Sequence, residues 1–530
     1  MKLPEFLLQS LKDRLLPLAA NLSASRVCVD RRQWLQLATT LGESDARLLT
    51  LWGSDDRDRD ARFRIYAAYL LPEGVMVVEH AIQATQATIP AYLSLAAIFP
   101  AAQRMQRAVY DLLGIAAEEL PGSEPDTSDP RGWLRHGGWP ETFFPLRRDV
   151  DGAQQHPNVS APYPFVMVEG SGVHEIAVGP VHAGTIEPGH FRFSVVGEKM
   201  LRLEERLGYT HKGVAKLFET MPQSSGHRLA ARISGDAAVA FSWAYCAALE
   251  SITGTICPAR STLLRALALE HERLANHLGD LGALGNDAGF AFGLTHFSRF
   301  KEDLLRSNAV TFGARYLLNY VIPGGVAVDL PAEGPSLLLD LYSSLEQSVT
   351  NLRSIYDEHA GLQDRFRGTG RLQPSTAEKL GALGLVARAS GIACDLRVDH
   401  PWPPYDRVAT KCMVQSTGDV AARVQLRFDE VYESLRLCRA FLHDLPTGSV
   451  QSPFPAAAPY QLGLGVIESW RGPVLIALET GPDGSIRRCH AHDPSWQNWP
   501  LIEYAIIGDI VADFPLINKS FNLSYSGQDG

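Results

Sequence analysis

Hydrophobic residues recur at intervals of three and four positions in three segments of the second half of the chain. The series are Leu264, Leu267, His271, Leu274, Leu278 and Leu281; Leu338, Leu341, Leu345, Val349 and Leu352; and Val424, Phe428, Val431, Leu435, Cys438 and Leu442. Side chains at this spacing lie along one face of an α-helix. Each series therefore predicts an amphipathic helix, and together they predict a helical bundle.

Shorter hydrophobic runs that are bounded by turn residues predict strands. Residues 62–71 and 75–78 flank Pro72-Glu73-Gly74, which indicates a hairpin. Residues 191–196 predict another strand, and residues 465–480 predict strand structure that is broken at Trp470-Arg471-Gly472. Residues 91–113 are rich in Ala and Leu, and they predict a helix that is interrupted at Pro100.

A polar, proline-containing segment at residues 151–162 indicates a domain boundary. We therefore expect two domains, residues 1–155 and residues 156–530. The first is predicted to be α/β, and the second to have a central helical bundle with a peripheral β-sheet. The predicted fold class of the whole chain is α+β.

The composition is that of a globular protein with an acidic balance. Of 530 residues, 45% are hydrophobic and 20% are charged, which is enough to bury a large core. Lys and Arg number 49 against 59 Asp and Glu, which gives a formal charge of -10. Because no block of basic residues offsets this charge, we expect no nucleic-acid partner.

The seven cysteines are isolated, and no two follow the Cys-x-x-Cys spacing. This pattern argues against a disulfide framework and against an iron–sulfur or zinc site formed by this chain alone. The sequence contains no run of about 20 apolar residues, and its first residues do not resemble a signal peptide. We therefore expect a reduced, cytoplasmic setting, with any membrane attachment made through partner subunits.

The segment from His271 to His277 superficially suggests a zinc-protease helix. That motif places two histidines four residues apart on one helical face. Here the two are six residues apart, or about 240° around a helix. We expect a histidine in the core and a histidine on the surface, without a metal.

Between positions 179 and 236, side chains that can carry a proton or a charge in a reaction are more closely spaced than in the rest of the chain. It contains His182, Glu187, His190, His211 and Arg232, near predicted turns and strand starts. Glu and His side chains can be tuned to relay protons near neutral pH. The alternative, that Glu187 and His190 are ordinary surface turn residues, remains open from the residues alone.

Several ordered motifs resemble the subunits of respiratory complex I and of related hydrogenases. Tyr110 to Ile115, Trp133-Leu134, Trp139-Pro140 and Phe144 to Asp149 are similar to the 30-kDa subunit of complex I. The motifs similar to the 49-kDa subunit and to the large subunit of group 4 membrane-bound NiFe hydrogenases are Glu187 to Arg192, Glu272-Arg273-Leu274, Arg388 to Gly391, Asp395-Leu396-Arg397 and Asn498-Trp499-Pro500. The resemblance implies a fusion of the two subunit types, with a second domain like the hydrogenase large subunit.

The same resemblance shows which ligands the chain lacks. Hydrogenases of this family bind nickel and iron through two Cys-x-x-Cys pairs, and the matching positions here hold Ser234, Ala237, Ser524 and Gly527. Soft metals of this kind favour thiolates over hydroxyl or methyl groups. We therefore expect no metal centre and no hydrogen chemistry.

The quinone-binding residues of complex I are also missing at the matched positions. The histidine that precedes the equivalent of Arg192 is replaced by Pro188, and the tyrosine that precedes the equivalent of Arg232 is replaced by Leu229. This leaves the usual quinone headgroup site in doubt.

The resemblance also implies roles for residues that are present. It places His211 and Arg232 near an iron–sulfur cluster of a partner subunit, and it makes Glu187, with His182 and His190, a candidate for proton transfer. Arg388, Asp395 and Arg397 are expected to form a charged network. The sequence leaves open whether that network faces a membrane arm or is an internal set of salt bridges.

The family context implies a subunit of a membrane-associated, NADH–quinone oxidoreductase-like complex that couples electron transfer to proton or ion translocation. The expected partners are an iron–sulfur small subunit and membrane subunits of the antiporter-like and quinone-site types. The chain alone is expected to bind no cofactor, with a quinone as the candidate molecule for the assembled complex. Its expected location is the cytoplasmic face of the inner membrane. The alternative is a non-catalytic scaffold that links the soluble arm to the membrane subunits.

Overall fold

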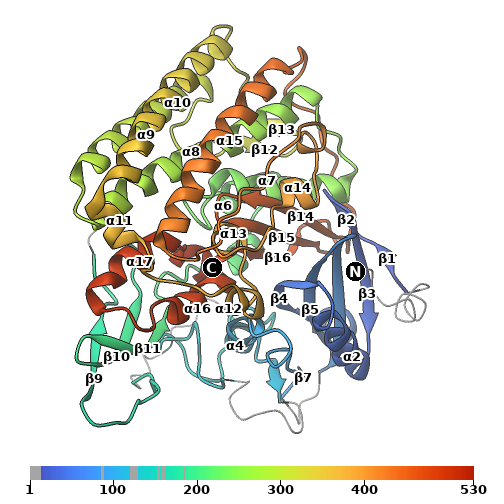
Figure 1. The fold of residues 1–530 in the computed structure, drawn as a ribbon. Helices are drawn as coiled ribbons and strands as arrows, with labels where there is room; N and C mark the ends of the chain where they lie inside the picture. The colour runs from blue at the N-terminus through green and yellow to red at the C-terminus, as the bar shows by residue number, and fades with distance from the viewer. Residues whose placement is uncertain (1–13, 85–88, 120–128, 152–155, 157–161, 184–185) are drawn as a thin grey trace.

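A computed structural model describes residues 14–84, 89–119, 129–151, 156, 162–183 and 186–530. A helical bundle forms one end of the molecule, and an N-terminal sheet unit and a small three-stranded sheet lie toward the other end (Figure 1). A second sheet, with three of its four strands from the last third of the chain, runs between them. The predicted boundary between residues 155 and 156 falls beside segments outside the described residues.

The N-terminal unit is a five-stranded sheet in the order β1-β3-β6-β5-β4. Its elements are β1 (Leu16–Pro17), β3 (Ala24–Val29), α2 (Arg31–Gly42), β4 (Arg47–Asp56), α3 (Arg57–Asp60), β5 (Arg62–Leu71), β6 (Gly74–Gln83) and α4 (Ala102–Leu113). Strands β5 and β6 form the predicted hairpin, with Leu71 opposite Gly74. The second strand extends to Gln83, five residues beyond its predicted end.

The helix predicted over residues 91–113 is wrong in its first half. Residues 91–93 form strand β7 (Ala91–Leu93), which pairs in parallel with β8 (Ala116–Glu118), and α4 begins only at Ala102. Pro100 cannot continue a helix from its N-terminal side without losing a backbone hydrogen bond. The side chain of Gln106 accepts a hydrogen bond from the Leu95 amide at 2.8 Å, which holds the non-helical segment against α4.

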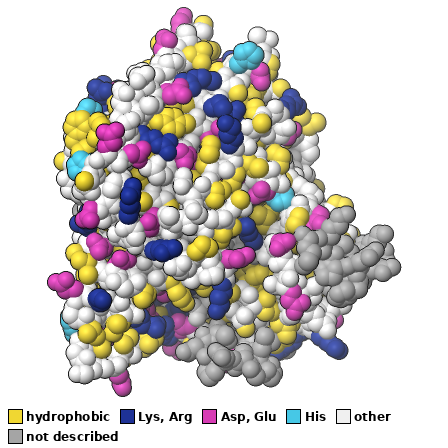
Figure 2. Space-filling model, viewed as in Figure 1, with side chains coloured by type: hydrophobic (Ala, Val, Ile, Leu, Met, Phe, Trp, Pro, Cys, Tyr) yellow, Lys and Arg dark blue, Asp and Glu magenta, His cyan; other side chains and the backbone are white. Residues whose placement is uncertain are grey.

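The three predicted amphipathic helices are confirmed as α8 (Ala259–Asp287), α10 (Gly334–Glu358) and α15 (Val420–His443). A further long helix, α9 (Ala291–Thr311), lies beside α8 and completes the bundle. The bundle surface that faces the viewer mixes basic, acidic and hydrophobic side chains (Figure 2). Shorter helices connect the long elements: α5 (Val214–Phe218), α6 (Gly226–Ala230), α11 (Ala360–Phe366), α12 (Pro374–Lys379), α13 (Gly384–Ala389) and α14 (Leu396–Asp399).

Helix α7 (Ala238–Thr253) separates the bundle from the second sheet. That sheet has the order β16-β15-β14-β2, from β14 (Leu462–Ser469), β15 (Gly472–Thr480), β16 (Ile486–His492) and β2 (Ala19–Ala20). A Cβ at Gly465 would lie 1.8 Å from the Ala244 carbonyl oxygen, so only glycine lets α7 approach β14 this closely. The break predicted at residues 470–472 is the β14–β15 turn.

Strands β12 (Val321–Ile322) and β13 (Gly325–Val326) form an antiparallel pair. The last three strands form the small sheet β11-β10-β9, from β9 (Val173–Val178), β10 (His190–Val196) and β11 (Lys199–Arg206). The chain then returns to this sheet through α16 (Ser495–Ala505), α17 (Phe514–Phe521) and α18 (Tyr525–Asp529). Strand β10 confirms the strand predicted at residues 191–196. Together, these elements give the predicted α+β fold.

Ion pairs join the N-terminal unit to the second sheet. Arg487 on β16 pairs with Asp56 at 2.8 Å and with Asp58 at 2.6 Å, and its side chain is almost fully buried. The pairing of β2 with β14 adds a second connection, because it carries the N-terminal segment into the C-terminal sheet. None of the helices in the described ranges combines the length and the hydropathy that crossing a bilayer requires.

Candidate functional site

The four positions that match the missing cysteine ligands come together in one buried cluster. The Ser234 and Ser524 hydroxyl oxygens are 2.8 Å apart, and Ser524 Oγ accepts a hydrogen bond from the Gly527 amide at 2.8 Å. The Ala237 amide donates to the Ser234 carbonyl at 3.1 Å. Two loops that are separated by almost three hundred residues thus meet at α18, in the arrangement that the resemblance implies. We call this group the vacated ligand cluster.

Asp236 and Arg471 form the next layer around this cluster. Ser234 Oγ donates to Asp236 Oδ1 at 2.7 Å, and Arg471 Nη1 donates to the same oxygen at 2.8 Å. Arg471 Nε donates to the Asn522 carbonyl at 2.6 Å. Burial by itself would raise the pKa of Asp236, but the adjacent Arg471 guanidinium lowers it below its ordinary value. The Asp236–Arg471 pair is therefore ionised and neutral overall.

The residues present do not fit a nickel–iron centre. Two hydroxyls, a methyl group and a hydrogen atom stand where thiolates are needed. The fourth position is also blocked, because a Cβ at Gly527 would lie 2.6 Å from Asp493 Oδ2. Asp493 is 1% exposed, and its Oδ2 has no hydrogen-bond partner among the described residues. The carboxyl of Asp493 thus takes up space that the fourth ligand would need.

The proposed proton-transfer residues lie on the loop and strand beside α18. Glu187 is exposed, and its Oε2 accepts a hydrogen bond from the Ser526 amide at 3.0 Å. The His182 ring lies 6.3 Å from the Tyr525 ring, whereas His190, at the start of β10, bonds to the Gly179 carbonyl at 3.3 Å. Burial lowers the pKa of both histidines. Among the described residues, no hydrogen bond joins these three side chains to one another.

His211 and Arg232 lie on neighbouring segments that Lys212 connects. His211 Nδ1 bonds to the Asp529 carbonyl at 2.8 Å, and burial lowers its pKa, so the imidazole is neutral at pH 7. Lys212 Nζ donates to the Arg232 carbonyl at 3.2 Å. The Arg232 side chain is exposed and donates to Asn319 at 3.0 Å. The structure therefore places His211 against α18 and Arg232 on the surface beside it.

Asp529 is a functional-site residue that the sequence analysis missed. Its carboxylate accepts hydrogen bonds from the Gly208 amide at 2.8 Å and from the Thr210 amide and hydroxyl at 2.9 and 2.6 Å. These contacts fix the turn that carries His211. Burial nevertheless raises the pKa of Asp529 to about 6 from its ordinary 3.8.

Asp529→Asn should change the pH dependence of folding. Because the pKa is higher in the folded chain than in the unfolded one, the stability that Asp529 contributes is full below about pH 4. It is lost as the pH rises through about 6, which amounts to about 3 kcal/mol. We therefore expect urea unfolding at pH 4 and pH 7 to show a change in relative stability. Between the two pH values, the free energy of unfolding of the variant should rise by about that amount relative to that of the unsubstituted protein. An equal difference at both values would contradict the assignment.

The charged residues Arg388, Asp395 and Arg397 lie in the interior rather than on a face available to a membrane arm. Arg388 pairs with Glu430 at 2.6 Å and with Glu468 at 3.2 Å, and it is 0% exposed. Arg397 pairs with Asp395 at 2.7 Å and reaches Glu270 on α8 at 3.0 Å. This favours the internal salt-bridge alternative. The network ties α8, α13, α14, α15 and β14 together.

The prediction that one of the two histidines on α8 lies at the surface is wrong. His271 and His277 are both 0% exposed. His277 Nε2 bonds to Glu430 Oε2 at 2.7 Å, whereas His271 bonds to Asn308 and Tyr342, each at 2.6 Å. Helix α8 packs against α9 on one side and α15 on another, so it has no broad solvent face. The two histidines do not share a site.

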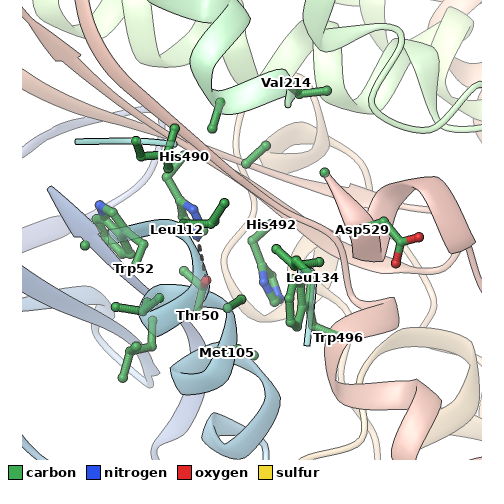
Figure 3. A pocket seen from close by; sticks show the side chains of 18 of the residues that line it. Thr50, Trp52, Met105, Leu112, Leu134, Val214, His490, His492, Trp496 and Asp529 are labelled. Carbon is green, nitrogen blue, oxygen red and sulfur yellow. Dashed lines mark hydrogen bonds between the residues drawn. The ribbon is translucent and has the colours of Figure 1, made fainter. Parts of the chain in front are cut away.

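A mainly apolar cavity lies where the N-terminal unit meets β16 and α18. His490 and His492 extend into this region, and His490 Nε2 lies 2.8 Å from the Thr50 hydroxyl (Figure 3). The His490 ring stacks on Trp52 at 5.0 Å. The cavity measures about 80 Å³, less than the ~150 Å³ that holds a benzene ring. We therefore regard it as a feature of the junction and assign it no ligand.

Comparison with known proteins identifies the two parts of the chain. Residues 27–156 match the family described as respiratory-chain NADH dehydrogenase, 30 Kd subunit, and residues 287–462 match the 49 Kd subunit. Formate hydrogenlyase subunit 5 of Escherichia coli (strain K12) is 30% identical over 487 residues, covering 91% of this chain and 84% of that protein. Hydrogenase-4 component G of the same organism is 30% identical over 495 residues, covering 92% and 84%.

A solved structure shares the fold. The membrane-bound sulfane sulfur reductase, an archaeal respiratory membrane complex, contains a chain that matches with a TM-score of 0.64 and 24% identity. The match covers 68% of this chain and 98% of that one. The relatives are thus components of hydrogenase and respiratory complexes. The chain belongs to the family that includes formate hydrogenlyase subunit 5 and hydrogenase-4 component G, and it combines a 30-kDa-type and a 49-kDa-type segment of the respiratory-chain NADH dehydrogenase.

Proposed function

We propose that this chain is a core subunit of a membrane-attached oxidoreductase complex and works without a nickel–iron centre. It receives electrons from an iron–sulfur small subunit and couples their transfer to proton or ion translocation. The observation that carries this proposal is the geometry of the vacated ligand cluster. Its four positions are still assembled beside Glu187 and His211, although the metal ligands are gone.

The small subunit docks, in this proposal, on the surface around His211 and Arg232. Lys212 and Arg232 are exposed there, together with Tyr209 at 39% and Leu217 at 47%. Aromatic, aliphatic and arginine side chains at one surface favour a protein interface. A hydrogen-bond donor or cation beside an iron–sulfur cluster raises its reduction potential. His211 takes that role when its ring is doubly protonated, because in the neutral ring the only proton lies on Nδ1, which bonds to the Asp529 carbonyl.

Glu187 is the proposed entry point for protons. Its side chain is exposed, yet one carboxyl oxygen bonds to the Ser526 amide at the start of α18. A carboxyl in this position can exchange protons with solvent on one side and with the site on the other. His182 and His190, both neutral at pH 7, line the same loop and strand.

The electron acceptor proposed for the assembled complex is a quinone. Pro188 and Leu229 replace the residues that usually contact the headgroup, so other subunits must supply part of that binding site. We place the chain on the cytoplasmic face of the inner membrane, attached through antiporter-like and quinone-site membrane subunits. A scaffold role without redox activity is the second candidate, because both sets of catalytic ligands are lost while the buried charge network is kept.

The proposal is tested by isolating the complex. We expect an affinity-tagged chain, extracted from membranes in mild detergent, to co-purify with an iron–sulfur protein and with polytopic membrane proteins, and to contain iron without nickel. A chain that elutes alone from every membrane preparation would overturn the proposal. Reduction of the co-purified cluster followed by quinone-dependent reoxidation separates the two candidates, since a scaffold would leave the cluster reduced.

The Arg232→Glu variant should lose the iron–sulfur partner, because it reverses the charge at the proposed docking surface. Arg407→Glu is the matched control: it changes another exposed arginine, between α14 and α15, and it should keep the partner.

A further inference from the structure

Three exposed basic residues lie together on the surface proposed above for the small subunit. They are Lys212, Arg228 and Arg232, and we call them the cationic face. Lys212 Nζ donates to the Arg232 carbonyl at 3.2 Å, and Arg232 Nη1 donates to the Arg228 carbonyl at 2.6 Å. Within the part of the chain that the structure describes, no carboxylate forms an ion pair with any of the three. This face is therefore positive although the whole chain has a formal charge of -10.

The two arginines of the cationic face have no compensating charge from the chain itself. They are four residues apart, and like charges at this spacing in a helical segment repel each other. Two carboxylates on adjoining segments are already engaged. Asp236 accepts a hydrogen bond from Arg471 at 2.8 Å, and Glu187 accepts one from the backbone of α18 at 3.0 Å and partly offsets the charge of Lys212. A partner that supplies carboxylates would relieve the repulsion between the arginines.

The turn at residues 314–320 adds an exposed aromatic side chain beside this face. Asn319 Oδ1 accepts a hydrogen bond from Arg232 at 3.0 Å, which joins the turn to the cationic face. Tyr316, three residues earlier in the same turn, is 53% exposed. It lines a cavity together with Gly235 and Asp236, which follow Arg232 closely in the chain. The tyrosine and the arginines are therefore available to one partner.

The backbone that carries Tyr316 is held in a fixed conformation. The Asn308 side chain donates to the Arg315 carbonyl at 3.1 Å, and Glu302 binds the Arg315 guanidinium at 2.7 Å. Leu317 is 3% exposed and has a φ of 56°, a conformation that residues other than glycine rarely adopt. An aromatic side chain on a fixed backbone loses little freedom when a partner binds. Tyrosine and arginine are also the residue types most enriched among those that dominate binding energy.

We propose that the cationic face and Tyr316 bind an acidic face of the iron–sulfur small subunit. Carboxylates of that subunit pair with Arg228 and Arg232, and an apolar pocket between them receives the Tyr316 ring. This assignment rests on the proposed function, because it states the chemistry of the partner at the surface already assigned to it. The charges accelerate association, whereas the tyrosine slows dissociation.

Rebinding of the partner at different salt concentrations tests this proposal. The complex is held on a resin through a tag on the full chain, and the iron–sulfur subunit is eluted with NaCl and then returned. The Kd should rise about 10-fold or more from about 50 to about 500 mM NaCl, because salt screens the attraction. Arg228→Gln should make this rise shallower, because one charge pair is lost. Tyr316→Ala should raise the Kd about 30-fold at every salt concentration and leave the rise unchanged.

Tyr504→Ala is the matched control, because Tyr504 is 54% exposed and lies on α16, outside the cationic face. It should leave the Kd unchanged, and a thermal melt of each variant shows that folded proteins are compared. Equal affinities of the Tyr316→Ala and Tyr504→Ala variants would contradict the role of Tyr316. A Kd that does not depend on NaCl, or a partner that about 1 M NaCl fails to release, would contradict the acidic face while leaving the proposed complex in place. If no iron–sulfur protein co-purifies, the proposed function fails, and this assignment fails with it.

Discussion

Arg388→Met should lower the free energy of unfolding by about 3–5 kcal/mol, as measured by urea denaturation. The reason is that Arg388 neutralises two carboxylates in the interior, Glu430 and Glu468, and also bonds to the Cys394 carbonyl at 2.9 Å. Met fills most of the volume but supplies no charge or donor. The two carboxylates then face burial with less compensation, and that desolvation penalty dominates the loss.

The control for this prediction is Arg436→Met on α15. Arg436 pairs with Glu433 at 2.6 Å, but its side chain is 41% exposed. An ion pair that water can screen contributes at most about 1 kcal/mol. If the free energy of unfolding fell by the same small amount in both variants, the interior network would not contribute to stability as we argue. The double variant Arg388→Met with Glu430→Gln should recover part of the loss, because it removes one stranded charge.

Spacing along the chain identified the elements whose burial is one-sided. Helices α10 and α15 and the β5–β6 hairpin each have a recognisable period or a turn signal, and these were predicted from residues alone. Helix α7 was not, because its residues from Ala238 to Glu250 are all buried and no polar face alternates with an apolar one. The same cause explains the wrong placement of His277 at the surface, because neighbouring helices enclose α8.

The residues of the candidate site likewise fall into those that the sequence predicted and those that only the structure revealed. The positions of Ser234, Ala237, Ser524 and Gly527 followed from matching motifs, and their convergence needed only the family fold. Arg471, Asp493 and Asp529 were missed because their roles come from pairings across 235 or more residues, or from a side chain that fills a particular space. Neither kind of contact leaves a local pattern in the sequence.

Replacing Asp493 should decide whether thiolates at the vacated positions can form a metal site. The variant Ser234→Cys, Ala237→Cys, Ser524→Cys, Gly527→Cys supplies four soft ligands, for which Cd²⁺ is a suitable probe. The new side chain at position 527 would still meet Asp493 Oδ2 at 2.6 Å and Cγ at 2.8 Å. Adding Asp493→Ala removes that overlap. We expect this fifth substitution to tighten Cd²⁺ binding about 5- to 150-fold, the equivalent of the 1–3 kcal/mol that overpacking costs.

Thiolate-to-cadmium absorption measures the affinities, and Gly235 provides the steric control. A Cβ at Gly235 meets no atom within 4 Å, so Gly235→Ala should leave the unfolding free energy nearly unchanged. Gly527→Ala should cost about 1–3 kcal/mol, and Asp493→Ala should relieve part of that cost. Equal Cd²⁺ affinities with and without Asp493 would mean that the carboxyl moves aside at no cost. Loss of the thiolates alone would then explain the missing metal site. A difference of the expected size means instead that the family's metal site has been closed twice, first by removal of its ligands and then by a carboxyl that fills the space of the fourth.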